Sequence, residues 1–326
     1  MAPVFENVFL VNSQPTSVIG VMHKPNLPSA YMASRSLSFL RLAFYKLFKK
    51  SLIPFRFLRH FRFFESLHNR AVDRFIPRGT ILLDCQGVKM YVDSNDTIIA
   101  RNLISSGRWE AYETELFCQS IKPHMTILDV GANLGYYSLV AAKILNGTGQ
   151  VIAFEPVPRN YQLFLKSIQR NQFKNIILVR EALSNINGTR EVFLDTRNYG
   201  ACSFSEKNVG ESSPITVETL TLDSCLSKLG VHRVDLLKVD VEGAEALVLE
   251  GAKQTLQQTR LIFMEFWPEA IRNLHQDPAM FLKELSRNFT VRRIDAREKR
   301  LIEVSDQGLG ELAASNGNLN IFLEVK

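Results

Sequence analysis

The sequence predicts an α/β fold, a parallel sheet with helices on both faces, and three observations lead to this prediction. Short apolar segments alternate with helix-like ones from residue 126 to residue 287, which is typical of consecutive βαβ units. The chain has 326 residues, of which 46% are hydrophobic and 22% are charged, so it can bury a large core. The strand expected at 126–130 ends in an acidic turn with two glycines, at the edge where open α/β sheets bind ligands.

Ahead of this α/β domain the chain has a different composition. Residues 1–34 contain several prolines and serines and show little periodicity, which indicates a loose N-terminal segment. Residues 35–78 are expected to form a basic amphipathic helical region, interrupted at Pro54 because proline removes a helix hydrogen bond. The α/β domain is therefore expected over residues 79–326.

The basic character of the chain is concentrated in residues 35–64. This stretch holds eight lysines and arginines and no acid, so of the net charge of +6 the other residues carry −2. Phenylalanines alternate with the basic residues, a pattern that suits the surface of an anionic membrane. Three other interpretations stay open: packing on the α/β domain or on a second copy, nucleic-acid binding, and an import signal.

The predicted elements of the α/β domain follow from local signals. A hairpin is expected to turn at Gln86-Gly87, and a helix over 109–121 is expected to end at Lys122-Pro123. The predicted strands cover 126–130, 150–155, 175–180, 188–194, 215–221, 234–240, 260–266 and 318–325. The predicted helices cover 135–145, 157–170, 245–257 and 278–287.

The turn after the first parallel strand reads Asp129-Val-Gly131-Ala-Asn133-Leu-Gly135 and opens a helix. Gly131 lets the backbone turn tightly beside a ligand, and the helix start offers free N–H groups to an anion. A dinucleotide site would carry a glycine where Asn133 stands, and the charge of Asp129 would repel a pyrophosphate. A ligand with a cationic centre, an ammonium and a carboxylate fits better, and S-adenosylmethionine has all three. Glu155, at the end of the next strand, could accept hydrogen bonds from ribose hydroxyls.

Several motifs, in the same order, resemble those of the FkbM-like family of S-adenosylmethionine-dependent methyltransferases. They are ISSGRWEAYE (104–113), LDVGANLGYYSLVAA (128–142), VIAFEPVPRNY (151–161), REALSNINGT (180–189) and LLKVDVEGAEALVLEGA (236–252). The resemblance covers roughly residues 80 to 270 and does not include residues 1–75. It implies a class I, Rossmann-like methyltransferase domain. In that fold a seven-stranded, mostly parallel sheet ends in an antiparallel strand, and the basic helical region is then an N-terminal appendage.

The resemblance also implies roles for residues around the cofactor. The methionine part is expected to be surrounded by Asp129, Gly131, Asn133 and Gly135, and Glu155 is expected to hold the ribose. The adenine is expected to lie beside Glu181, Ala182 and Leu183. Glu113 would close the site from the preceding helix. Among the aromatic residues, Tyr136 is a candidate for a ring that flanks the sulfonium.

The second informative stretch is KVDVEGAE (238–245), which contains three acidic residues. Acidic residues are relevant here because a hydroxyl that is methylated must lose a proton. Asp240 should end the fourth strand and could act as a general base, worth roughly 10²- to 10⁴-fold in rate. Alternatively, Asp240 and Glu242 could hold a divalent ion that lowers the pKa of the hydroxyl. The metal-free version is favoured, because the sequence offers no convincing third ligand. Glu265, at the end of the fifth strand, could face the acceptor, whereas Glu245 is expected to cap its helix.

The sequence therefore predicts a methyltransferase that uses S-adenosylmethionine, and the resemblance favours O-methyl transfer to a sugar, a glycan or glycolipid, or another polyhydroxylated metabolite. A nucleic-acid methyltransferase is a less favoured alternative, and a non-catalytic cofactor-binding or membrane-associated module is another. The four cysteines form no CxxC pair, so a structural zinc site is not expected. No signal peptide or span of roughly 18 to 20 apolar residues is recognised, which favours a cytoplasmic location, with peripheral membrane contact through residues 35–64.

Overall fold

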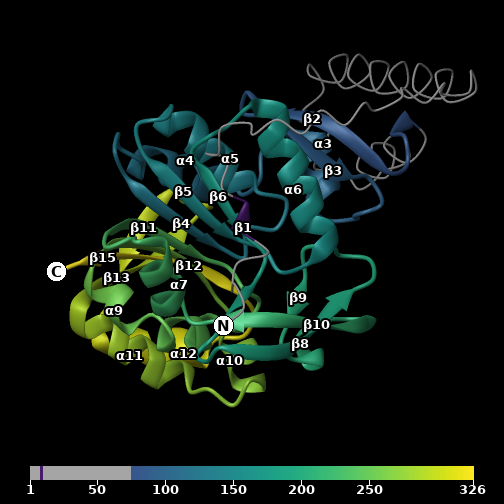
Figure 1. Ribbon diagram of the computed structural model, residues 1–326. Coiled ribbons are helices and arrows are strands. Elements are labelled where there is room, and N and C mark those ends of the chain that lie inside the picture. The colour runs from purple at the N-terminus through teal and green to yellow at the C-terminus, as the bar shows by residue number, and fades with distance from the viewer. Residues whose placement is uncertain (1–7, 10–74) are drawn as a thin grey trace, which may run out of the picture. The chain divides into compact units, whose positions relative to one another are not determined.

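The computed structural model describes residues 8–9 and 75–326 (Figure 1). The predictions for residues 1–34 and for nearly all of 35–78, including the membrane contact, lie outside the described residues. Leu82–Val92 and Asp96–Lys326 belong to one compact unit, which also includes the short strand β1 (Val8–Phe9). The described residues 75–81 and 93–95 belong to a second unit. Across residues 75–326, no helix is long and apolar enough to cross a membrane.

A nine-stranded sheet forms the centre of the first unit, in the order β1-β6-β5-β4-β11-β12-β15-β13-β14. Its inner strands are β6 (Ile176–Val179), β5 (Gln150–Phe154), β4 (Thr126–Val130), β11 (Val234–Val239), β12 (Thr259–Phe266), β15 (Leu319–Val325) and β13 (Phe289–Asp295). These seven have the predicted class I arrangement, because β15 runs antiparallel to both of its neighbours while β4, β5, β6, β11 and β12 are parallel. The predicted count of seven is too low, because β1 and β14 (Arg300–Glu303) add antiparallel edges.

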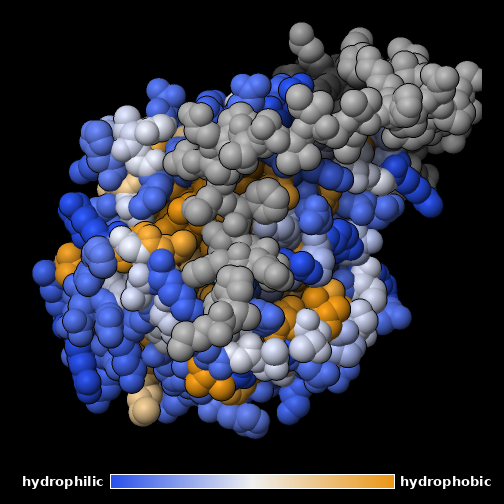
Figure 2. Space-filling view, in the orientation of Figure 1, coloured by the Kyte–Doolittle hydropathy of each residue, from blue (hydrophilic) through white to orange (hydrophobic). Residues whose placement is uncertain are grey.

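Helices cover both faces of the sheet, as predicted (Figure 1). Along β4, Leu128 and Val130 pack in a core with α7 (Leu222–Leu229), α8 (Glu245–Glu250), α11 (Pro278–Asn288) and α12 (Asp306–Ala314). The alternate residue Asp129 contacts α5 (Tyr136–Leu145) on the other face through Ser138. Helices α4 (Ala111–Ser120) and α6 (Pro158–Asn171) also match the predicted segments. On the face seen in Figure 2, α11 presents mostly hydrophilic side chains, while its Leu282 and Leu285 are buried.

The predicted helix over 245–257 is wrong as a single element, because it divides into α8 and α9 (Lys253–Gln257). Tertiary contacts explain the break. A side chain at Gly251 would overlap the backbone carbonyl of Ser184. The carboxylate of Asp223 then accepts the N–H groups of Gln254 and Thr255, at 2.9 and 2.8 Å, and caps the second helix.

The remaining elements include a hairpin and a second sheet. The predicted hairpin is β2 (Thr80–Cys85) with β3 (Val88–Asp93). A second, four-stranded sheet has the order β7 (Ala182–Leu183), β10 (Ser212–Leu220), β8 (Gly188–Asp195) and β9 (Cys202–Ser203). The elements that the sequence did not predict are β1, α3 (Ile99–Ser106), β7, β9, the 3-10 turn η2 (Glu206–Asn208), α7, α10 (Pro268–Asn273), β13, β14 and α12.

Candidate active site

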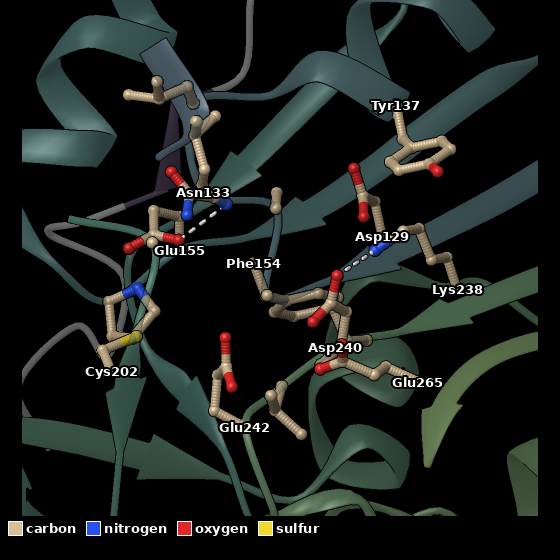
Figure 3. Close-up of a pocket in the computed structure, with 18 of the residues that line it drawn as sticks. Asp129, Asn133, Tyr137, Phe154, Glu155, Cys202, Lys238, Asp240, Glu242 and Glu265 are labelled. Carbon is tan, nitrogen blue, oxygen red and sulfur yellow. Dashed lines mark hydrogen bonds and ion pairs between the residues drawn. The ribbon is translucent and has the colours of Figure 1, made fainter. Parts of the chain in front are cut away.

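A pocket of about 300 Å³ opens at the carboxyl ends of the central parallel strands (Figure 3). This volume lies in the range of pockets that bury a small ligand or cofactor. The strands β4, β5, β11 and β12 each deliver an acidic residue to it, namely Asp129, Glu155, Asp240 and Glu265. Because the carboxyl ends of these strands lie at one edge of the sheet, side chains far apart in the sequence meet there.

The glycine turn after β4 brings the chain very close to the end of β11. Gly131 has a φ of +79°, and a Cβ at this position would overlap the backbone carbonyl oxygen of Asp240. The N–H of Gly131 donates to the carbonyl of Phe154 on β5, at 3.2 Å. Gly135, with a φ of +81°, begins α5, where a Cβ would overlap the ring of Phe164. Glycine is therefore required at both positions, for conformation and for space.

Glu155 is held in a fixed orientation beside this turn. Its Oε2 accepts the backbone N–H of Asn133 at 2.7 Å, and its Oε1 accepts that of Val157 at 2.8 Å. Only 2% of the residue is exposed. Burial raises the pKa of Glu155 from 4.5 to about 7, although both hydrogen bonds oppose this rise.

Asp129 is buried on the α5 side of the sheet and has one oxygen without a partner. Its Oδ2 accepts the hydroxyl of Ser138 at 2.6 Å, while its Oδ1 accepts no hydrogen bond. Burial raises the pKa of Asp129, and the positive charge of Lys238 opposes this. A buried carboxylate oxygen without a donor is costly, so this atom is a ready acceptor for a cationic group of a ligand.

Lys238 is a buried lysine within β11. Its Nζ lies 2.9 Å from Oδ2 of Asp240 and 4.7 Å from the ring centroid of Tyr137. Burial lowers the pKa of Lys238, but the charges of Asp240 and Asp129 outweigh burial and raise it. The hydroxyl of Tyr137 donates to Oε2 of Glu110 at 2.8 Å, so a chain of polar contacts crosses the pocket wall.

Three carboxylates gather at one end of the pocket, those of Asp240, Glu242 and Glu265 (Figure 3). Each offers an oxygen that lies within 4.8 Å of the other two. Burial raises the pKa of Glu242 to about 8, and the charge of Asp240 adds to the rise. Oε1 of Glu265 accepts the amide of Asn318 at 2.6 Å, whereas its Oε2 is buried and accepts no hydrogen bond.

The turn that carries Glu242 is fixed by its neighbours. Glu242 has a φ of +52°, and its backbone carbonyl accepts the hydroxyl of Ser203 at 2.7 Å. Glu245 begins α8, and its Oε1 accepts the N–H groups of Val241 and Gly243, at 3.3 and 3.1 Å. Glu245 thus lies in the first turn of α8, as predicted, but it does not cap the helix, because both N–H groups that it binds belong to the turn before α8.

Some of the remaining predicted residues line the pocket and others do not. Three of them line it: Tyr136, Ala182 and Leu183. Glu181 is buried but is absent from the lining, and so is Gly135. Glu113, predicted to close the cofactor site, lines a smaller adjoining pocket instead. Glu110, the residue just before α4, lines both the larger and the smaller pocket.

Sequence reasoning missed Glu110 and Lys238, and it had little signal for either. Glu110 belongs to the motif at 104–113, but its side chain reaches the pocket because its backbone is left-handed, with a φ of +40°. A lone lysine in an apolar strand is a weak signal by itself. The structure explains why Lys238 lies at the site, because it is the cross-strand neighbour of Asp129 in the pairing of β11 with β4.

The sequence around this site is similar to that of known methyltransferases. Residues 129–289 match the family model described as "Methyltransferase FkbM domain", and residues 50–183 match that of "Protein-L-isoaspartate(D-aspartate) O-methyltransferase (PCMT)". The chain is 30% identical to the 2-O-methyltransferase NoeI of Sinorhizobium fredii over an alignment of 159 residues, and the match covers 44% of this chain and 64% of that protein. It is 25% identical to the hexuronic acid methyltransferase AglP of Haloferax volcanii over 158 residues, 48% of this chain and 62% of that protein.

Among solved structures, the chain is similar to Methyltransferase FkbM from Methylobacillus flagellatus. The identity is 12% and the TM-score 0.39, with 68% of this chain and 52% of that chain covered. The chain spans less than two thirds of the length of the two curated relatives. The family match over 129–289 contains Asp129, Glu155, Asp240 and Glu265. Over residues 129–289, just under half of its length, this chain matches the FkbM-like family of S-adenosylmethionine-dependent methyltransferases.

Proposed function

We propose that this chain transfers the methyl group of S-adenosylmethionine to a hydroxyl of a sugar, a glycan or glycolipid, or another polyhydroxylated metabolite. The observation that carries the proposal is the meeting of Glu155, Asp129 and Asp240 in one pocket, from the ends of three adjacent parallel strands. The names of two relatives, a 2-O-methyltransferase and a hexuronic acid methyltransferase, support an oxygen acceptor on a sugar.

The residues of the larger pocket fit this cofactor. The unpartnered Oδ1 of Asp129 would hold its ammonium, and Glu155 would accept its ribose hydroxyls. Each oxygen of Glu155 already accepts one backbone N–H and keeps a lone pair for a second donor. The apolar Ala182 and Leu183 would lie against the adenine.

The bound cofactor supplies an electrophilic methyl group on its sulfonium. The chain must then orient an acceptor hydroxyl and remove its proton. Asp240 is suited to this task, because the ion pair with Lys238 fixes one of its oxygens at the pocket edge. A positioned base contributes roughly 10²- to 10⁴-fold to such a step, and alignment of the acceptor supplies a further part.

Calorimetric titration with S-adenosylmethionine tests the cofactor half of the proposal. We expect binding by the wild type, loss of binding in Glu155→Ala, and retained binding in Asp240→Ala. Glu284→Ala, a change of an exposed acid on α11, is the matched control and should bind like the wild type. A folded wild-type chain that binds no cofactor would refute the proposal and favour a non-catalytic module.

Transfer of a labelled methyl group tests the acceptor half. Hexuronic acids, neutral sugars and glycolipids would be compared with RNA and DNA at equal concentrations. We expect label in a hydroxylated acceptor, lost in Asp240→Asn while cofactor binding remains. Label found in nucleic acid alone would contradict the proposed acceptor class and support the nucleic-acid alternative.

A further inference from the structure

We propose that Asp240, Glu242 and Glu265 together bind a hard divalent cation such as Mg²⁺ at the acceptor end of the pocket. The inference deepens the proposed function and rests on it for one point only, that the cation's open positions face the acceptor hydroxyl. From the sequence a metal-free site was favoured because no third ligand was evident. The fold supplies that ligand, because β12 lies beside β11 and places Glu265 next to Asp240.

The spacing of the three carboxylates suits one shared cation. Their nearest oxygens lie within 4.8 Å of one another. Oxygens on opposite sides of one cation are about 4.2 Å apart for Mg²⁺ and about 5 Å apart for Ca²⁺, from the usual metal–oxygen distances. The three side chains therefore need only small rotations to share an ion.

A second observation, independent of the spacing, also indicates a missing partner. Oε2 of Glu265 is buried and accepts no hydrogen bond, although Oε1 of the same carboxylate is bound by Asn318. Buried carboxylate oxygens in folded proteins nearly always have a donor or a cation beside them. Glu265 lines the pocket, so a cation there would be its partner.

The charge of the pocket lining supports a cation rather than another hydrogen-bond donor. Among the described residues, six carboxylates line the pocket: Glu110, Asp129, Glu155, Asp240, Glu242 and Glu265. Lys238 is the one lysine or arginine among the described lining residues, and it is paired with Asp240. S-adenosylmethionine adds a single net positive charge. A divalent ion would offset the negative charge that Glu242 and Glu265 carry in their carboxylate forms.

Such an ion would act on the acceptor. A hydroxyl bound to Mg²⁺ loses its proton more readily, because the ion stabilises the alkoxide. The proton would leave for solvent or for a carboxylate at the pocket edge, and no other reactant is required. An acceptor with an amine could also occupy this end of the pocket. Binding of the metal in the absence of any acceptor separates the two cases.

The test is a titration of the full chain with Mn²⁺, followed by the electron paramagnetic resonance signal of the free ion. We expect one equivalent to bind, Mg²⁺ to compete, and Glu265→Gln to weaken binding at least about tenfold. Glu284→Gln, on the exposed face of α11, is the matched control and should bind like the wild type. If Glu265→Gln does not fold, Glu242→Gln takes its place, with folding checked by thermal unfolding.

Titration with S-adenosylmethionine on the same samples separates failure of this inference from failure of the proposed function. Cofactor binding without Mn²⁺ binding would overturn the cation site and leave the proposed function standing. Mn²⁺ binding that is unchanged in both glutamine variants would also overturn it. Mn²⁺ binding that depends on Glu265, without cofactor binding, would support the cation site and refute the proposed function.

Discussion

Lowering the pH from about 7.5 to about 5.5 should weaken the binding of S-adenosylmethionine to this chain by about 25-fold. The reason is Glu155, whose pKa burial raises to about 7. The carboxylate form accepts the hydrogen bonds of the ribose hydroxyls, whereas the protonated form has lost acceptor capacity. With a pKa near 7, about three quarters of the side chains are ionised at pH 7.5 and about 3% at pH 5.5. The expected change corresponds to about 1.9 kcal/mol of binding free energy.

The folding free energy should depend on pH in the opposite direction. Because burial raises the pKa of Glu155 above its usual 4.5, the protonated form is preferred in the folded chain without cofactor. Its contribution to stability is complete below about pH 4.5 and is lost as the pH rises through about 7. The full difference is about 3 kcal/mol. When the cofactor binds, its hydrogen bonds to the Glu155 carboxylate offset the stability that the empty site loses when Glu155 ionises.

Calorimetry across this pH range checks the binding prediction, with Glu155→Gln as the matched variant. The variant should bind weakly and with little dependence on pH, because glutamine does not titrate. Other groups that titrate, such as Asp129 or the amino group of the ligand, affect both proteins and cancel in the ratio. The reasoning is refuted if the wild type and Glu155→Gln lose affinity in parallel between pH 7.5 and pH 5.5.

Three further variants test the structure around the pocket. Gly131→Ala should unfold at a clearly lower temperature than Gly230→Ala, because both have a positive φ but only Gly131 meets a backbone carbonyl. Equal melting temperatures would contradict that close approach. Lys238→Met should lower the unfolding free energy by about 3 kcal/mol in denaturant titrations, because it leaves acids without their buried cation, while the exposed Lys283→Met should change little. Ser138→Ala should lower the free energy of unfolding by about 1–3 kcal/mol and weaken cofactor binding, because it removes the hydrogen-bond donor to the buried carboxylate at the end of β4. Unchanged cofactor affinity in this variant would contradict the prediction.

The parallel strands and the cofactor turn could be predicted because their signals are local. The inner parallel strands are mostly apolar and mostly buried on both faces, and all six residues of β11 are buried. Once the strands are parallel, their carboxyl ends lie at one edge, so Asp129, Glu155 and Asp240 were expected to meet. The glycines at 131 and 135 indicated a tight turn, and the structure gives both a positive φ.

The rest depends on contacts between distant segments, which local patterns do not contain. Glu113 was predicted from the motif at 104–113, whereas Glu110 of the same motif lines the larger pocket, from a left-handed backbone that the sequence does not reveal. The third carboxylate of the acidic cluster was missed as a partner of Asp240 for a similar reason. Glu265 takes its position from the pairing of β12 with β11 and from Asn318, which follows 53 residues later.

Lys238 interacts with both Asp240 and Asp129, so a variant at Asp240 changes more than one part of the site. Glu265 is hydrogen-bonded to Asn318 and not to Lys238, so a variant at Glu265 leaves the ion pair in place. Replacing Asp240, in contrast, removes the ion-pair partner of Lys238 and changes the field at Asp129. A loss of methyl transfer in an Asp240 variant that still binds the cofactor can thus come from a lost base, a lost metal ligand or a displaced Lys238. A Glu265 variant removes a metal ligand and leaves the ion pair of Lys238 with Asp240 in place. The metal affinity of the Glu265 variant is therefore more informative than the methyl-transfer activity of an Asp240 variant.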